Sequence, residues 1–341
     1  MLNAMKKILP LMLSMVLILM SGCGADRNAS KPPQITIAVQ PLPNDDSIAR
    51  EWYAAELGKV SGAKVVMLSY DSSLLANNAM ATGNIDIAVF GSATAAIGIS
   101  KGLPYEIFWI HNVEGDNECL IVKNGSDINS IAELKGKRVG VTFGATAQYS
   151  LLQAMRQAGL SSDDVMLLDM QPPEILNAWR EGQLDAAFVW QPTVDELLRD
   201  GRILITSRQL DEQGITTADV AVVSKQFAQQ HPEIVKKYVE LQVRAHELYK
   251  SDPKAAAAIT ADSLNLPVEE ALKQMNELVW IDIKDQLSDR YMGTTEHKGH
   301  IAQTLFETAQ FLEKSNVIDR AASLEKFSEA INPSFAQALV K

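Results

Sequence analysis

Short apolar and β-branched runs alternate with amphipathic stretches along most of the chain from Gln34 onward. The runs have the length of buried strands, and the stretches between them have the apolar spacing of helices. Such alternation predicts parallel sheets that are covered by helices on both faces. The predicted strands lie at 35–39, 64–68, 85–90, 106–110, 119–123, 138–142, 165–170, 186–190, 202–206 and 218–223. The predicted helices between them lie at 46–58, 72–82, 92–101, 146–159, 173–181 and 192–199.

The alternation stops and restarts once, which predicts two similar α/β units joined near residues 122–125 and 207–219. From Phe227 onward nearly everything is predicted to be helical. We therefore expect an α/β fold of two doubly wound lobes with a hinge and a helical C-terminal tail. The expected divisions are 34–122 for the first part of lobe 1, 123–217 for lobe 2, and 218–341 for the completion of lobe 1 and the tail.

The N-terminal segment has the pattern of an export signal. Lys6 and Lys7 precede an apolar run at 8–20 that is too short to span a bilayer. Ser21 and Gly22 then lead to Cys23, in a pattern that resembles a lipoprotein signal. We expect a signal peptide at 1–22, a polar tether at 23–33, and lipid on Cys23 that anchors the protein to a membrane on its extracytoplasmic face. The alternative is an ordinary secreted protein in which Cys23 has no such role.

Composition excludes several classes of function. The 341 residues carry a net charge of −11 and contain no block of Lys and Arg, which argues against nucleic acid as a partner. Cys119 lies within the apolar stretch CLIV, where a buried small hydrophobe is favoured over a nucleophile. His297 and His300 lack a third and fourth ligand at metal-binding spacing. We expect neither a metal nor a cofactor.

Three predicted strand-to-helix junctions carry small residues that would let a ligand approach backbone N–H groups. They are Gly91–Thr94, Gly144–Ala147 and Trp190–Thr193. The first N–H groups of a helix lack internal partners and favour an anion. Two such junctions from different lobes could hold one oxyanion. The alternative is that Ser92 and Thr146 are ordinary helix N-caps.

Two acidic residues stand at the predicted crossovers. Glu118 opens the strand that contains CLIV, and Asp219 opens ADVAVV. Carboxylates at both hinges would suit a ligand whose other end is cationic, although either could be a solvated strand end. Trp190 and Tyr149 suit a pocket wall that keeps a polar tip toward the ligand. No set of residues is spaced for acid–base or nucleophilic catalysis, so we do not expect an enzyme.

Several segments resemble one known family. The stretches FGATAQYSLLQAMRQAGL, QPPEILNAWREGQLDAAFVWQPTVDEL and GITTADVAVVSKQFAQQHPEIV look like those of the substrate-binding proteins of ABC importers for taurine and related aliphatic sulfonates. This is a type II periplasmic-binding-protein family. The resemblance implies a ligand between the lobes, a permease and its ATPase as partners, and a monomer.

The resemblance also implies roles for individual residues. The sulfonate-side candidates are Gln40, Ser92, Thr146, Gln148 and Tyr149, and the ammonium-side candidates are Glu118, Trp190 and Asp219. Gln148 departs from the His that some relatives place before the Tyr. Three alternatives remain open, namely a general alkanesulfonate or sulfate-ester binder, an enzyme similar to thiamin-pyrimidine synthases, and a receptor ectodomain.

Overall fold

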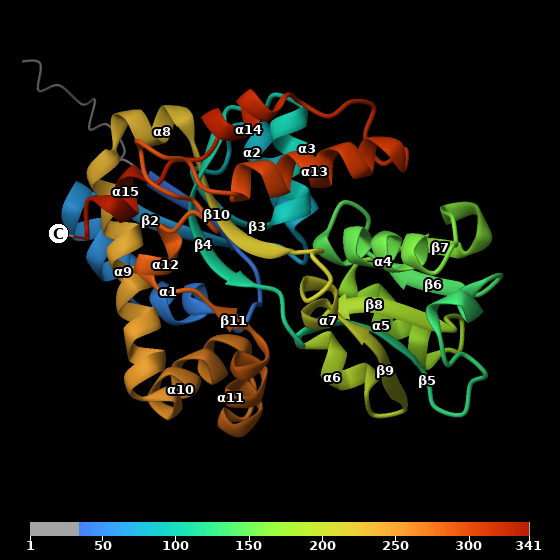
Figure 1. Ribbon diagram of the computed structural model, residues 1–341. Coiled ribbons are helices and arrows are strands. Elements are labelled where there is room, and N and C mark those ends of the chain that lie inside the picture. Colours follow the sequence, from blue (N-terminus) through green and yellow to red (C-terminus); the bar gives the residue numbers. More distant parts are fainter. Residues whose placement is uncertain (1–33, 341) are drawn as a thin grey trace, which may run out of the picture. The chain divides into compact units, whose positions relative to one another are not determined.

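The computed structural model describes residues 34–340, which are arranged around two β-sheets (Figure 1). The first sheet has the order β11-β4-β10-β3-β1-β2, and the second has the order β7-β6-β8-β5-β9. The strands of the first sheet are β1 (Gln34–Val39), β2 (Lys64–Ser69), β3 (Ile87–Gly91), β4 (Tyr105–Val113), β10 (Ala218–Ser224) and β11 (Val279–Trp280). Those of the second are β5 (Glu118–Lys123), β6 (Arg138–Val141), β7 (Met166–Asp169), β8 (Ala186–Trp190) and β9 (Gly201–Thr206).

Helices connect the strands and make up most of the C-terminal region. The helices that alternate with strands are α1 (Asp45–Ser61), α2 (Ser73–Ala81), α3 (Ser92–Ser100), α4 (Thr146–Gln157), α5 (Pro172–Arg180), α6 (Thr193–Leu197) and α7 (Ser207–Asp211). The later ones are α8 (Lys225–Gln230), α9 (Pro232–Ser251), α10 (Pro253–Leu264), α11 (Val268–Glu277), α12 (Ile283–Gln286), α13 (Ile301–Lys314), α14 (Leu324–Glu329) and α15 (Ser334–Gln337). Two 3₁₀ turns, η1 (Ile131–Leu134) and η2 (Ser162–Asp164), precede β6 and β7. No helix in residues 34–340 combines the length and apolar character that crossing a membrane requires.

The two sheets are mixed, whereas the sequence pattern predicted parallel ones. In each sheet three strands are parallel, namely β2, β1 and β3 in the first and β7, β6 and β8 in the second. β10 then pairs antiparallel with β3 and β4, and β5 pairs antiparallel with β8 and β9. The central strands are buried on both faces, so alternation of apolar runs could not reveal the direction of each strand.

The chain first passes between the sheets at residues 114–117. β4 ends at Val113 in the first sheet, and β5 begins at Glu118 in the second. The sequence placed this join at 122–125, at the end of β5, and the boundary of lobe 1 after residue 122. In the structure the chain crosses before β5 begins. The error arose because CLIV reads as an apolar strand in either sheet. The return crossover occupies 207–217 and contains α7, which agrees with the expected segment.

Polar contacts hold both crossovers against the end of α11. The Glu277 carbonyl oxygen accepts from the Asp116 N–H at 2.9 Å and from Arg208 Nη2 at 3.0 Å. Arg208 Nε also donates to Asp116 Oδ2 at 2.7 Å. Lys273 of α11 forms an ion pair with Asp195 of α6 at 2.6 Å. The C-terminal region thus contacts the second sheet's helices next to the two connecting segments.

Gly115 is required by the close approach at this crossover. A Cβ atom there would lie 2.0 Å from the Glu277 carbonyl oxygen, a backbone atom that cannot rotate away. A Cβ atom on Gly140 would lie 2.7 Å from Leu184 Cδ1, at the end of a flexible side chain. We expect Gly115→Ala to lower the free energy of unfolding by about 1–3 kcal/mol and Gly140→Ala to lower it less. Urea denaturation of both variants tests this, and an equal loss would contradict it.

Residues 1–33, for which the sequence predicts the signal peptide, the tether and the lipid-bearing Cys23, lie outside the described residues.

Candidate ligand-binding site

A small cavity lies where the carboxyl ends of strands from both sheets meet. Its volume is about 10 Å³, roughly the space that one water molecule occupies. The lining residues are Gln40, Leu42, Ser73, Glu114, Asn117, Glu118, Ala145, Thr146, Trp190 and Asp219. Five of the residues predicted from sequence are thereby brought together, namely Gln40, Glu118, Thr146, Trp190 and Asp219. Ligands of open α/β sheets bind at this edge, beyond the carboxyl ends of the strands.

Glu118 and Asp219 occupy equivalent positions in the two sheets. Each stands near the start of the antiparallel strand that pairs with the last parallel strand of its sheet. Glu118 on β5 lies opposite Trp190 at the end of β8, and Asp219 on β10 lies opposite Gly91 at the end of β3. The topology therefore delivers one acidic residue from each sheet to the same cavity.

Glu118 is buried and accepts hydrogen bonds from three hydroxyl groups. Its Oε2 accepts from Thr146 Oγ1, and its Oε1 accepts from Ser207 Oγ at 2.7 Å and from Ser150 Oγ at 3.4 Å. Burial, followed by the negative charge of Glu114, raises the pKa of Glu118 to about 8, although the three hydroxyl donors oppose the shift. The carboxyl group connects β5 to α4 and α7.

Asp219 lies beside a second acid that sequence reasoning missed. Burial, and then the charge of Glu118, raises the pKa of Asp219 to about 7, while contacts with Glu114 and Asn112 oppose the rise. Burial and the neighbouring Asp219 raise the pKa of Glu114 well above its usual range. Asn117 Nδ2 donates to Glu114 Oε2 at 2.5 Å. The misplaced first crossover hid Glu114, since an acidic residue just after β4 would otherwise have been considered with Glu118.

The opposite side of the cavity offers hydrogen-bond donors. Ser73, in the first turn of α2, accepts from Gln40 Nε2 at 3.1 Å and from the Gly91 N–H at 2.9 Å. Both acceptor positions of its oxygen are thus used, which leaves its O–H free to donate. Thr146 begins α4, whose first N–H groups have no partner within the helix. This side therefore suits an anionic oxygen.

Ser92, Gln148 and Tyr149 do not line the cavity. Ser92 Oγ accepts from the Ala218 N–H at 3.2 Å, and Gln148 Oε1 accepts from the Gly144 N–H at 2.7 Å. Tyr149 packs edge-on against Phe311, with ring centroids 5.5 Å apart. Thr146 and Ser150, four residues apart on α4, both donate to Glu118, whereas Gln148 and Tyr149 have these other partners.

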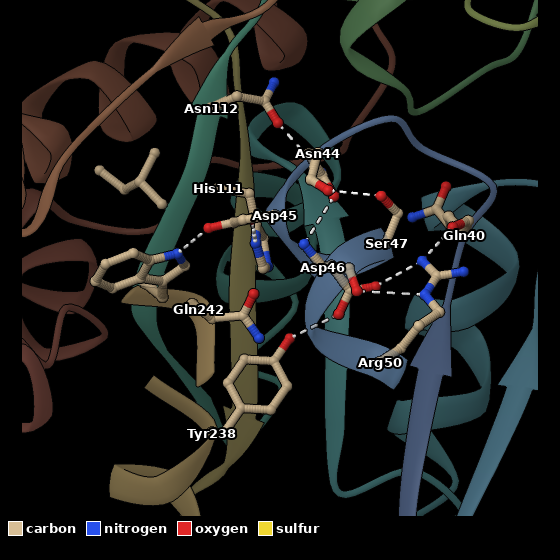
Figure 2. Close-up of polar contacts among 12 residues, drawn as sticks. Gln40, Asn44, Asp45, Asp46, Ser47, Arg50, His111, Asn112, Tyr238 and Gln242 are labelled. Carbon is tan, nitrogen blue, oxygen red and sulfur yellow. Dashed lines mark hydrogen bonds and ion pairs between the residues drawn. The ribbon is translucent and has the colours of Figure 1, made fainter. Parts of the chain in front are cut away.

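A buried network of polar contacts surrounds the start of α1 (Figure 2). At the start of α1, the Asp45 carboxylate accepts from Trp109 Nε1 at 2.9 Å and contacts His111 Nδ1 at 2.5 Å. Asn44 Nδ2 donates to Asn112 Oδ1 at 3.2 Å. Because Asn112 lies opposite Asp219 in the sheet, the start of α1 is tied to the strand pair that carries Asp219.

The same helix also fixes Gln40. Arg50 Nη2 donates both to the Gln40 carbonyl oxygen at 2.8 Å and to Asp46 Oδ2 at 2.7 Å. Tyr238 OH of α9 donates to Asp46 Oδ1 at 3.1 Å (Figure 2). Burial is the largest single effect and opposes ionisation of Asp46, but Arg50, His111 and Tyr53 together outweigh it, so the pKa of Asp46 lies below its usual value. The network therefore carries a stable ion pair.

No group of three or more His, Cys, Asp or Glu side chains within residues 34–340 is arranged to hold a metal ion. His297 and His300 are both exposed. The cavity itself is lined by carboxyl groups, hydroxyl groups and the start of α4.

The arrangement of sheets is that of the periplasmic binding proteins. The alkanesulfonate-binding protein SsuA from Xanthomonas axonopodis pv. citri, solved bound to MOPS, superposes with a TM-score of 0.70 at 18% identity, over 89% of this chain and 99% of that one. The desulfurization enzyme DSZB shares the fold with a TM-score of 0.61 at 18% identity, over 90% of this chain and 98% of that one.

The chain belongs to the NMT1/THI5-like family, whose model matches residues 49–256. The taurine-binding periplasmic protein of Escherichia coli is 32% identical over 279 residues, which span 82% of this chain and 86% of that protein. The family and the fold expected from the sequence are thereby confirmed.

The raised pKa values predict how stability depends on pH. A carboxyl group whose pKa rises on folding binds a proton more tightly in the native state, so its contribution to stability is lost as pH rises through the native pKa. With the pKa of Asp219 at about 7 and that of Glu118 at about 8, and the unfolded values of both at about 4, the ligand-free protein should lose stability from about pH 4.5 to about pH 8, and these two groups should add little further change above that. Thermal unfolding at constant ionic strength measures this. A flat or rising profile would contradict the assignment.

Proposed function

We propose that the protein is the extracytoplasmic solute-binding component of an ABC importer, and that its ligand is a sulfonate bearing an ammonium group, with taurine as the leading candidate. The observation that carries the proposal is the grouping of Glu114, Glu118 and Asp219 around one buried cavity. No Lys or Arg belongs to that lining within residues 34–340. Buried carboxylates require a compensating positive charge. A ligand cation would supply it.

The donor side of the cavity supports an anionic group at the other end of the ligand. Ser73 has a free O–H, and the first turns of α2 and α4 present N–H groups at the positive ends of their dipoles. Taurine is a compact zwitterion whose two charged ends match these two sides. The proteins that are similar to this chain in sequence or fold include a taurine-binding protein and an alkanesulfonate-binding protein, which supports the same class of ligand.

Ligand entry requires the two sides of the cavity to separate. A cavity of about 10 Å³ is smaller than any sulfonate. The crossovers at 114–117 and 207–217 are the segments through which the chain passes between the sheets, so we propose that they act as the hinge. Opening would expose the acids to solvent, and closure on the ligand would give the permease a distinct surface to recognise.

Two alternatives are less well supported. A general alkanesulfonate or sulfate-ester binder would have no use for the acids, and their burial would then be an uncompensated cost. An enzyme would need a reactive group, and DSZB demonstrates that this fold can host one. Cys119 is buried on β5, and burial raises the pKa of its thiol well above the usual value. It is therefore unsuited to act as a nucleophile.

Asp219→Asn tests the assignment of the ligand's cationic end. Removing one partner of a buried charge pair costs about 3–5 kcal/mol, or roughly a hundred- to several-thousand-fold in affinity. We expect that loss for taurine and little change for ethanesulfonate in calorimetric titrations. The exposed Asp319→Asn serves as the matched control. Equal losses for both ligands would show that Asp219 has a structural role only.

We also propose that lipid on Cys23 anchors the protein to the membrane, since Cys23 follows the signal-like segment directly. In cells fed radiolabelled palmitate, the wild-type protein should carry label and partition into detergent, whereas Cys23→Ser should do neither. Cys119→Ser, which leaves the proposed site intact, is the control. An unlabelled wild-type protein would refute the anchor.

A further inference from the structure

Glu114 and Asp219 line the same small cavity, and each perturbs the ionisation of the other. The backbone enforces this, because the Glu114 N–H donates to the Thr217 carbonyl oxygen at 2.9 Å and Asp219 follows two residues later. Both side chains are buried, with exposed fractions of 3% for Glu114 and 6% for Asp219. Two acids are thus held together where water cannot separate their charges.

The groups that face this pair are acidic or neutral. Glu118 approaches from β5, and Asp45 approaches from α1 with its carboxylate already bonded to His111. Two neutral amides also face the pair: Asn117 of the crossover donates to Glu114, and Asn112 of β4 lies opposite Asp219 in the sheet. The cation closest along the crossover, Arg208, is engaged by Asp116 at 2.7 Å.

Two carboxylates in contact cannot both remain ionised without a cation, because each destabilises the charge of the other. Two ionised carboxylates have only acceptor oxygens. One shared proton removes the repulsion and supplies an O–H donor, so that one carboxyl group can hydrogen-bond to the other. Asn117 Nδ2 occupies Oε2 of Glu114, which leaves its other oxygen to share a proton with Asp219. The hydroxyl donors around Glu118 give that third acid a separate means of compensation.

We propose that Glu114 and Asp219 share one proton in the ligand-free protein, and that the ammonium group of the bound sulfonate displaces this proton into solvent. This inference rests on the proposed function. The pair carries one negative charge before binding. Afterwards it carries two, which the ammonium reduces to one. Because taurine is a neutral zwitterion, release of the proton leaves the whole site more negative by one charge, the charge of the sulfonate on the donor side. At the acidic side, one N–H of the ligand replaces the shared hydrogen toward each carboxylate.

Replacement of the shared proton by an ammonium group restricts the ligand further than the presence of a positive charge alone. The ammonium group must be small and must carry at least two N–H donors, one for each acid. N,N,N-trimethyltaurine keeps the positive charge but has no N–H, so it should bind far more weakly than taurine. Below the pH at which the free pair loses its proton, affinity for taurine should rise by up to about tenfold per pH unit.

The first test is calorimetric titration of the ligand-binding chain at about pH 7.5, above the pKa of about 7 of Asp219, in buffers that differ in ionisation enthalpy. We expect taurine binding to release close to one proton and ethanesulfonate binding to release none. In Glu114→Gln, the amide can donate to Asp219 without a shared proton, so release should disappear and taurine affinity should lose its dependence on pH. The exposed Glu181→Gln is the matched control and should behave as the wild type does.

The second test does not depend on a variant that must fold. Infrared difference spectra of the wild-type protein should show the carbonyl band of a protonated carboxyl group that taurine removes. Taurine binding without proton release, or without loss of that band, would overturn the inference while leaving the proposed function intact. Failure of taurine and ethanesulfonate alike to bind would instead overturn the proposed function, and with it the displacement step.

Discussion

Burial of three carboxyl groups around one small cavity is the constraint on which the rest of the site depends. An uncompensated buried charge costs several kcal/mol, so each acid needs hydrogen-bond donors, a nearby cation or a bound proton. Glu118 receives three hydroxyl donors from α4 and α7. Glu114 accepts a hydrogen bond from Asn117, and Asp219 lies in the same cavity with Asn112 opposite it in the sheet. Protein groups alone leave that pair short of positive charge, which makes the cavity receptive to a cation.

The fold delivers these acids by a repeated topological device. In each sheet an antiparallel strand is inserted beside the last parallel strand, and each inserted strand belongs to a segment that has just crossed, or returned, from the other sheet. Its first residues therefore lie at both a carboxyl edge and a crossover. Any movement of the crossovers would change the distance between Glu118 and Asp219. Ligand recognition and hinge motion consequently involve the same residues.

The polar network at the start of α1 explains how a cavity between two sheets can be well defined. Arg50 fixes the backbone of Gln40, and Asn44 holds Asn112 beside Asp219. Asp45 and Asp46 tie these contacts to β4 and α9 through Trp109 and Tyr238. A mobile loop at this position would pay an ordering cost whenever a ligand bound. Here the network orders these residues before any ligand binds, so binding does not have to order them.

The sequence by itself determined the order of strands β1 to β10, the return crossover, and the family through its second α/β unit, but it missed β11. It also singled out Glu118 and Asp219, because acidic residues at the start of apolar strands stand out locally. Only the tertiary structure decided strand direction, the position of the first crossover, and therefore the role of Glu114. It also turned Gln148 and Tyr149 away from the cavity that Thr146 lines. The reason is physical: apolar periodicity reports which residues are buried, whereas pairing between distant strands and the phase of a helix decide which buried groups meet.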